Sequence, residues 1–301
     1  MGWQGRILSY LIAGGILAFL VIGLGLAVSA IYLALALEAG RTSIEELFTK
    51  ADEAFAERFI EERMKEAISH YEAILPHFAR LSIQSRAFVL DRLSQLYYEL
   101  TTFSAGDTPE DRELFLKGKD YGFRSLALSP GFAQWQGRDF KRALSYVTDP
   151  AALLWTANNW GALFGYDPWQ GMANVGKVRA MFERCLELEE AYWGGSCHNA
   201  LGALLVVTPG FLGGDLEEGK FHLERAIEID FYYLENHVVY AQYWGFTYDF
   251  LGRMSGVRDR ELIEQELSFV LEAPIGRWPF WNREAKKEAE LLLEKLEEFL
   301  H

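Results

Sequence analysis

The chain has 301 residues, and its 43 acidic and 29 basic side chains give a net charge of −14, which argues against nucleic acid or an anionic membrane surface as a partner. An aromatic content of 15% with only eight prolines excludes an intrinsically disordered protein. The two cysteines are too few for a disulfide-based scaffold.

The first forty residues differ in character from the rest of the chain. No charged residue occurs from Ile7 to Leu37, and a helix of that length exceeds the roughly 30 Å hydrocarbon core of a bilayer. We therefore predict a membrane anchor helix over residues 1–40 and a folded domain over residues 41–301. The alternative is a secretory signal cleaved near Ala36, although the apolar run is longer than the roughly 7–15 residues of a typical signal core.

Helix signals dominate residues 41–301, and no convincing strand pattern is present. Thr108-Pro109-Glu110-Asp111 combines an N-cap residue, a first-turn proline and first-turn acids. Asp149-Pro150 repeats the cap and the proline. Gly213-Gly214-Asp215 ends one helix and caps the next, with Glu218 at the third helical position. These signals predict an all-α fold.

Several segments share the spacing of the second helix of a tetratricopeptide repeat, in which a small residue, a large apolar residue and another small residue lie on one face. They start at Ala67, Gly118, Val178 and Gly219. The first-helix pattern occurs in Ala200–Leu204 and more loosely from Tyr240 to Trp244. We therefore predict a tetratricopeptide-like α-solenoid, with a generic helical bundle as the alternative. Residues Trp281 to Leu300 form a predicted amphipathic helix that caps its end.

A set of tryptophan and asparagine side chains follows the Asp149-Pro150 helix start. Trp155 shares a helix face with Asn158 or Asn159, and such a face could stack on an apolar ligand while the amides fix its polar end. The alternative is that the rings pack in the core and the amides bond a loop. Nearby aromatic residues would extend the surface. The predicted ligand or partner groove comprises Trp155, Asn158, Asn159, Trp160, Tyr192, Trp193, Tyr240 and Trp244.

The sequence offers no catalytic or metal-binding motif. The six histidines form neither a His-x3-His pair nor an HExxH motif, and no GxSxG, P-loop or GxGxxG pattern occurs, so we predict no enzyme activity, no cofactor and no metal. Cys185 and Cys197 lie at unequal distances from the turn at Trp193-Gly194-Gly195. That offset predicts two separate thiols, with a disulfide as the alternative in a periplasmic domain.

Residues 149–244 resemble the TRAP-transporter T-component (TatT-like) family. The resemblance rests on DPAALLWTANNWGALFG, on the Tyr-Trp-Gly-Gly turn before an Ala-Leu-Gly-Ala helix, and on the Pro-Gly-x-Leu-Gly-Gly-Asp linker that follows. It implies an extracytoplasmic helical-repeat protein that forms trimers around a pore, has a hydrophobic cleft and associates with a periplasmic solute-binding protein. Many relatives look like lipoproteins or secreted proteins, whereas this chain carries the predicted membrane helix.

The resemblance, together with the predicted membrane helix, implies a non-enzymatic accessory protein of a TRAP-type solute-uptake system, anchored by one span in the bacterial inner membrane. A short N-terminal tail that carries Arg6 favours a periplasmic position for the domain. Its expected partners are a solute-binding protein, an apolar ligand and further copies of itself. The alternative is a tetratricopeptide scaffold subunit of a larger membrane complex, whose groove binds a helix or tail of another protein.

Overall fold

The computed structural model describes residues 44–104, 106 and 108–301. The chain divides into two compact units, residues 1–50 and 51–301, and the account below concerns the second. In the first unit, residues 44–50 are helical, whereas the predicted membrane span from Ile7 to Leu37 lies outside the described residues. Over the described ranges, no helix combines the length and the apolar composition that a membrane crossing requires.

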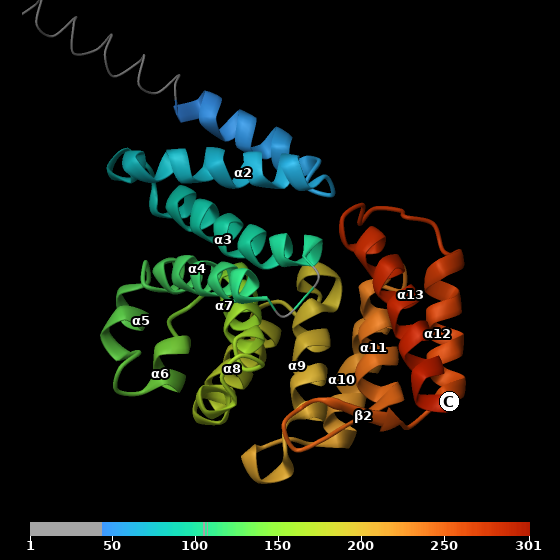
Figure 1. Ribbon diagram of the computed structural model, residues 1–301. Helices are drawn as coiled ribbons and strands as arrows, with labels where there is room; N and C mark the ends of the chain where they lie inside the picture. Colours follow the sequence, from blue (N-terminus) through green and yellow to red (C-terminus); the bar gives the residue numbers. More distant parts are fainter. Residues whose placement is uncertain (1–43, 105, 107) are drawn as a thin grey trace, which may run out of the picture. The chain divides into compact units, whose positions relative to one another are not determined.

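The second unit is built of helices with one small hairpin, so the predicted all-α class is confirmed (Figure 1). Within the described residues, the helices are connected by four short 3-10 turns: η1 (Leu75–Arg80), η2 (Thr101–Phe103), η3 (Tyr192–Gly195) and η4 (Gly210–Leu212). The helices that follow residues 51–56 are α2 (Glu61–Ile74), α3 (Ile83–Leu100), α4 (Pro109–Leu126), α5 (Pro130–Trp135), α6 (Phe140–Leu144), α7 (Pro150–Ala162), α8 (Pro168–Leu188), α9 (Ser196–Val207), α10 (Leu216–Ile229), α11 (Glu235–Gly245), α12 (Arg260–Glu272) and α13 (Trp281–Leu300).

The predicted helix starts are confirmed by their capping hydrogen bonds. Thr108 and Asp111 form a reciprocal capping box at the start of α4. At α7, the Asp149 carboxylate accepts a hydrogen bond of 2.9 Å from the backbone N–H of Ala151. At α10, Asp215 accepts one of 2.9 Å from the backbone N–H of Glu218. Each bond satisfies a backbone donor that the first turn of a helix leaves without a partner.

Consecutive helices pack in pairs: α3 with α4, α7 with α8, α9 with α10, and α11 with α12. Helix α3 also contacts α7, and α9 contacts α11, so the first helices of the pairs lie together along one side. Glycines permit the close approach of α9 to α10, because a Cβ on Gly219 would lie 2.8 Å from a Val206 methyl and 3.0 Å from the Gly202 carbonyl oxygen. This pairing is what a repeat array needs, and the solenoid itself stays a prediction.

The C-terminal helix α13 closes the last pair, as the leucine pattern predicts. Its inward face packs with α11 and α12 in one hydrophobic cluster, and its other face carries lysines and glutamates. Figure 1 shows α9 to α13 side by side. The buried residues on the inward face of α13 are Ala285, Ala289, Leu292 and Leu296.

A short antiparallel hairpin follows α11, and the prediction that strands are absent is wrong at this point. Strand β1 (Phe246–Tyr248) pairs with β2 (Met254–Val257), and Phe246 stands opposite Val257. Strands of three and four residues are too short to show a period-2 pattern. The turn between them is stabilised by Asp249, which accepts hydrogen bonds from the backbone N–H groups of Leu251 and Arg253.

Candidate functional site

Two hollows, of about 660 and 630 Å³, lie along α7, α9 and α11. The two hollows share lining residues from the first helices of the packed pairs, so we treat them as one groove and refer to it as the inner groove. Small side chains on α7 and α9 leave the space open, and aromatic side chains of α3 and α11 complete the shared wall. The residues that line both hollows are Tyr98, Asn158, Ala162, Ala200, Ala203, Gln242 and Tyr243.

The larger hollow forms the apolar half of the inner groove. Helix α8 contributes Val178 and Phe182, and the β-hairpin contributes Tyr248 and Met254. No charged side chain lines this half within the described part of the chain. The lining of this half includes the exposed ring of Phe250. This ring is stacked with the exposed ring of Phe211 from η4, at a centroid distance of 6.5 Å. An uncharged hollow of this size suits an apolar small molecule.

The other half of the inner groove is aromatic and acidic. Burial, and then the charges of Glu288 and Glu284, raise the pKa of Glu235 to about 8. Burial also raises the pKa of Glu288. Glu284 forms an ion pair of 2.8 Å with Lys287. This half therefore presents a carboxyl group with a raised pKa beside the rings of Tyr98, Trp155, Tyr233, Tyr243 and Trp281.

A third hollow, of about 650 Å³, also has Trp155 in its lining. We refer to it as the Asp91 hollow; it is lined by α3, the start of α7 and η3. Trp155 is 1% exposed and belongs to the lining of both this hollow and the inner groove. Its ring meets Trp193 edge-on at 5.5 Å and stacks on Trp281 at 6.5 Å.

Only part of the predicted groove is brought together. Asn158 lines the inner groove, and Trp155 lines it at one end. Tyr192 and Trp193 line the Asp91 hollow instead. Asn159 is buried, and its amide donates hydrogen bonds to the carbonyl oxygens of Ser94 (2.9 Å) and Trp155 (2.7 Å), so it joins α7 to α3.

The remaining predicted residues lie elsewhere. Trp160 packs edge-on against Phe123 at 5.2 Å and lines a small separate hollow of about 160 Å³. The Tyr240 hydroxyl donates a hydrogen bond of 2.9 Å to Glu224. The ring of Trp244 lies under the Arg258 guanidinium at 4.7 Å. A ligand role for any of the eight predicted residues stays a prediction.

The structure adds groove residues that the sequence patterns did not select. Tyr98 comes from α3, about sixty residues before Asn158, and no local motif marks it. Glu235, at the start of α11, looks like an ordinary first-turn acid in the sequence. Trp281 carries a signal, because it lies in an aromatic cluster, but the terminal helix accounted for it equally well.

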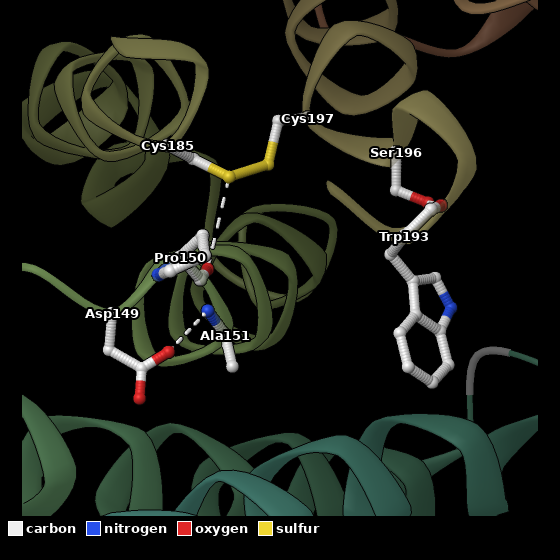
Figure 2. The surroundings of a disulfide bond; sticks show 7 residues. All are labelled: Asp149, Pro150, Ala151, Cys185, Trp193, Ser196 and Cys197. Carbon is white, nitrogen blue, oxygen red and sulfur yellow. Dashed lines mark hydrogen bonds between the residues drawn. A yellow bond between two sulfur atoms is a disulfide. The ribbon is translucent and has the colours of Figure 1, made fainter. Parts of the chain in front are cut away.

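The prediction of two separate thiols is wrong, because Cys185 and Cys197 form a disulfide with a Cα–Cα distance of 6.2 Å (Figure 2). The turn is wider than the Trp-Gly-Gly motif suggests: α8 ends at Leu188 and α9 begins at Ser196. Each cysteine therefore lies in the helical turn next to the connection. Cys185 Sγ also lies 3.8 Å from the carbonyl oxygen of Pro150 at the start of α7.

Two histidines, His198 on α9 and His222 on α10, lie side by side, whereas His237 on α11 lies elsewhere. His198 Nδ1 and His222 Nδ1 are 2.7 Å apart, and His198 Nε2 is 3.3 Å from Glu190. Burial, and then the proximity of His198, lower the pKa of His222 to about 4. His237 contacts Glu266 instead, at 2.6 Å. The described residues contain no group of three or more His, Cys, Asp or Glu side chains that could hold a metal ion.

Comparison with known proteins extends the resemblance of residues 149–244 over most of the second unit. A family model described as TRAP transporter T-component matches residues 60–300, from the residue before α2 to the last residue of α13. No curated protein matches the chain. The match includes the inner groove, the Asp91 hollow and the disulfide.

Proposed function

Because the chain belongs to the TRAP transporter T-component family, we propose that it is a non-enzymatic accessory protein of a TRAP-type solute-uptake system. In this proposal the inner groove holds an apolar ligand, and the domain binds a solute-binding protein. The observation that carries it is the apolar half of the groove, whose lining has no charged side chain among the described residues. A partner's charged tail would need charged groups to pair with, and this lining does not offer them.

The dimensions of the groove support a small-molecule occupant. A volume of about 660 Å³ falls in the roughly 300–1,000 Å³ range of ligand pockets. Polar groups are few in this half, and they include the amides of Asn158 and Gln242. An apolar wall with a few polar groups fits a molecule with an apolar body and a small polar group.

The disulfide supports a position outside the cytoplasm. Disulfides persist in oxidising compartments such as the periplasm and are rare where thiols are kept reduced. The bond between Cys185 and Cys197 therefore agrees with a periplasmic domain. The anchor helix predicted over residues 1–40 completes the proposal, which assigns the second unit to the periplasmic side of the inner membrane.

The ligand is tested with the full-length chain purified in detergent, by extraction and mass spectrometry of the small molecules that co-purify. Ala203→Trp should fill the groove, since Ala203 lines both of its halves. We expect wild type to carry an apolar molecule and Ala203→Trp to retain at least tenfold less. Ala133→Trp on exposed α5 is the matched control and should retain it. Equal amounts in both variants, at unchanged melting temperature, would contradict a ligand role for the groove.

The partner is tested by cross-linking in native membranes, followed by purification of the full chain and mass spectrometry of the attached proteins. The proposal expects a solute-binding protein. Recovery of subunits of a respiratory or secretion complex would support the alternative of a scaffold subunit instead. The trimer that the family resemblance implies belongs to the proposal as well, and light scattering of the detergent-solubilised chain measures it.

A further inference from the structure

The middle of the inner groove carries polar side chains that no other part of the protein engages. Four uncharged polar residues line both halves of the groove: Tyr98 on α3, Asn158 on α7, and Gln242 and Tyr243 on α11. All four are half-buried, and none of their side chains forms a hydrogen bond with another residue of the described part of the chain. We refer to these four side chains as the polar belt. Its hydroxyl and amide groups can each donate and accept hydrogen bonds.

Packing holds the two tyrosine rings of the polar belt in place. The ring of Tyr98 lies 6.2 Å from that of Trp155 and 6.4 Å from that of Trp281, measured between centroids. The ring of Tyr243 is stacked with that of Tyr248 at 5.6 Å. Ring contacts on this scale leave the hydroxyl groups free, so a ligand in the groove meets positioned hydrogen-bonding groups that need not break an internal bond first.

Two buried polar atoms in the aromatic half also lack partners. Asn199 is 4% exposed and Trp281 is 7% exposed, and both line this half. The Asn199 Oδ1 and the Trp281 Nε1 form no hydrogen bond within the described residues. Buried polar groups are nearly always hydrogen-bonded. The first of these atoms accepts hydrogen bonds and the second donates them, so the lining leaves groups of both kinds unsatisfied.

The charged groups beside the polar belt disfavour a carboxylate. The lining of the aromatic half contains the carboxyl groups of Glu235, Glu284 and Glu288 and the amine of Lys287. Lys287 is paired with Glu284 at 2.8 Å, so it is not free to pair with an anionic ligand. Burial, and then the charge of Glu235, raise the pKa of Tyr98, which indicates that this carboxyl group lies near the belt. A carboxylate bound at the belt would be repelled by these acidic groups whenever they are ionised.

An ammonium group is disfavoured for a different reason. Burial raises the pKa of Glu288, and burial, followed by the charges of Glu288 and Glu284, raises that of Glu235. Both carboxyl groups therefore resist the ionisation that a salt bridge requires. The cost of removing two charges from water can exceed their mutual attraction. The apolar half on the other side of the belt offers no charged side chain among the described residues.

We propose that the polar group of the groove's ligand is uncharged and both donates and accepts hydrogen bonds, as a primary carboxamide or a hydroxyl group does. This inference rests on the proposed function, in which the inner groove holds an apolar ligand. The polar group would bond the polar belt, and the apolar body would lie in the apolar half. The groove would thus select neutral amphipathic molecules and reject carboxylates with the same carbon chain.

The test is ligand-observed NMR titration of the full-length chain in detergent at pH 7 with three probes that have the same five-carbon chain. They are pentanamide, pentanoate and n-pentylammonium, which are neutral, anionic and cationic. Competition by an excess of pentanamide, and loss of binding in Ala203→Trp, distinguish binding in the groove from uptake by micelles. We expect pentanamide to bind at least tenfold more tightly than either charged probe.

The possible failures of this test are distinguishable. Equal or tighter binding of a charged probe in the groove overturns the proposal for the polar group, but it leaves the apolar ligand of the proposed function in place. Absence of saturable binding in the groove for all three probes overturns both.

Matched variants locate the binding at the polar belt. Tyr243→Phe removes one hydroxyl group, and Asn158→Leu replaces an amide by an apolar group of similar size. Each should weaken pentanamide binding about fivefold or more and leave the binding of pentanoate unchanged. A purely structural role would instead change the affinity for both probes alike. Tyr146→Phe, which removes a hydroxyl group at the Asp91 hollow, is the control and should keep wild-type affinity. Wild-type preference for pentanamide in folded Tyr243→Phe and Asn158→Leu variants refutes the assignment.

Discussion

Reduction of the Cys185–Cys197 disulfide should lower the stability of the second unit by about 3 kcal/mol. The two cysteines are 12 residues apart, and closing a loop of that length removes about 10 cal/mol/K of entropy from the unfolded chain, which is about 3 kcal/mol at 25 °C. A domain of this size loses about 2–4 °C of melting temperature per kcal/mol. We therefore expect the melting temperature to fall by about 6–12 °C on reduction.

The assay is circular dichroism melting of the full chain in detergent, with and without a phosphine reductant. Alkylation and mass measurement establish the thiol count, which should be none before reduction and two after it. The Cys185→Ala/Cys197→Ala variant should have a melting temperature close to that of the reduced wild type, and the reductant should not change it. An unchanged melting temperature in wild type with both thiols alkylated would refute the loop-entropy reasoning. Two free thiols in unreduced protein would refute the bond itself.

Urea unfolding of the full chain tests three further predictions. Gly219→Ala should destabilise the protein by about 1–3 kcal/mol, because the added methyl group overpacks against α9. The control Gly176→Ala has open space around it in α8 and should stabilise the protein by up to about 1 kcal/mol, so equal effects of the two substitutions would refute the close-contact argument. Because burial and His198 lower the pKa of His222 to about 4, the unfolded chain binds a proton near pH 6.5 that the folded chain takes up only near pH 4. The free energy of unfolding should therefore decrease as the pH is lowered from 6.5 to 4. His222→Gln should reduce this loss of stability by about 1–2 kcal/mol, and an unchanged pH profile in that variant would contradict the role of His222. Burial raises the pKa of Glu235 to about 8, so stability is lost as pH rises from 4.5 through 8, and Glu235→Gln should exceed wild type in stability at pH 8.5 but not at pH 4.5.

The features that the sequence predicted correctly are those that depend on neighbouring residues. The caps at Thr108, Asp149 and Asp215 were predictable because a side chain bonds a backbone group two or three positions away. The small residue at Gly219 was predictable because the contact between paired helices recurs at a fixed spacing. Such signals need no knowledge of the tertiary structure.

The groove residues were harder to predict, because they depend on which helices meet. Helical rotation of 100° per residue places Asn158 about 60° from Trp155, so these two share a side, but it places Trp160 about 140° away. Trp160 accordingly packs among Phe123 and Phe140 rather than in the groove. Tyr98 reaches the groove only through the packing of α3 on α7, which no spacing in the sequence encodes.

The turn from Tyr192 to Gly195 connects the disulfide to the Asp91 hollow. A Cβ on Gly194 would lie 2.9 Å from the ring of Tyr233, and Gly195 takes φ 87°, so both positions depend on the absence of a side chain. The turn therefore has little freedom to relax, and it holds Trp193 in its left-handed conformation with the ring 5.5 Å from Trp155. That conformation costs about 1–3 kcal/mol. The cross-link that flanks the turn stabilises the folded chain by a similar amount, about 3 kcal/mol, because it lowers the entropy of the unfolded chain, and it therefore offsets the cost of this conformation.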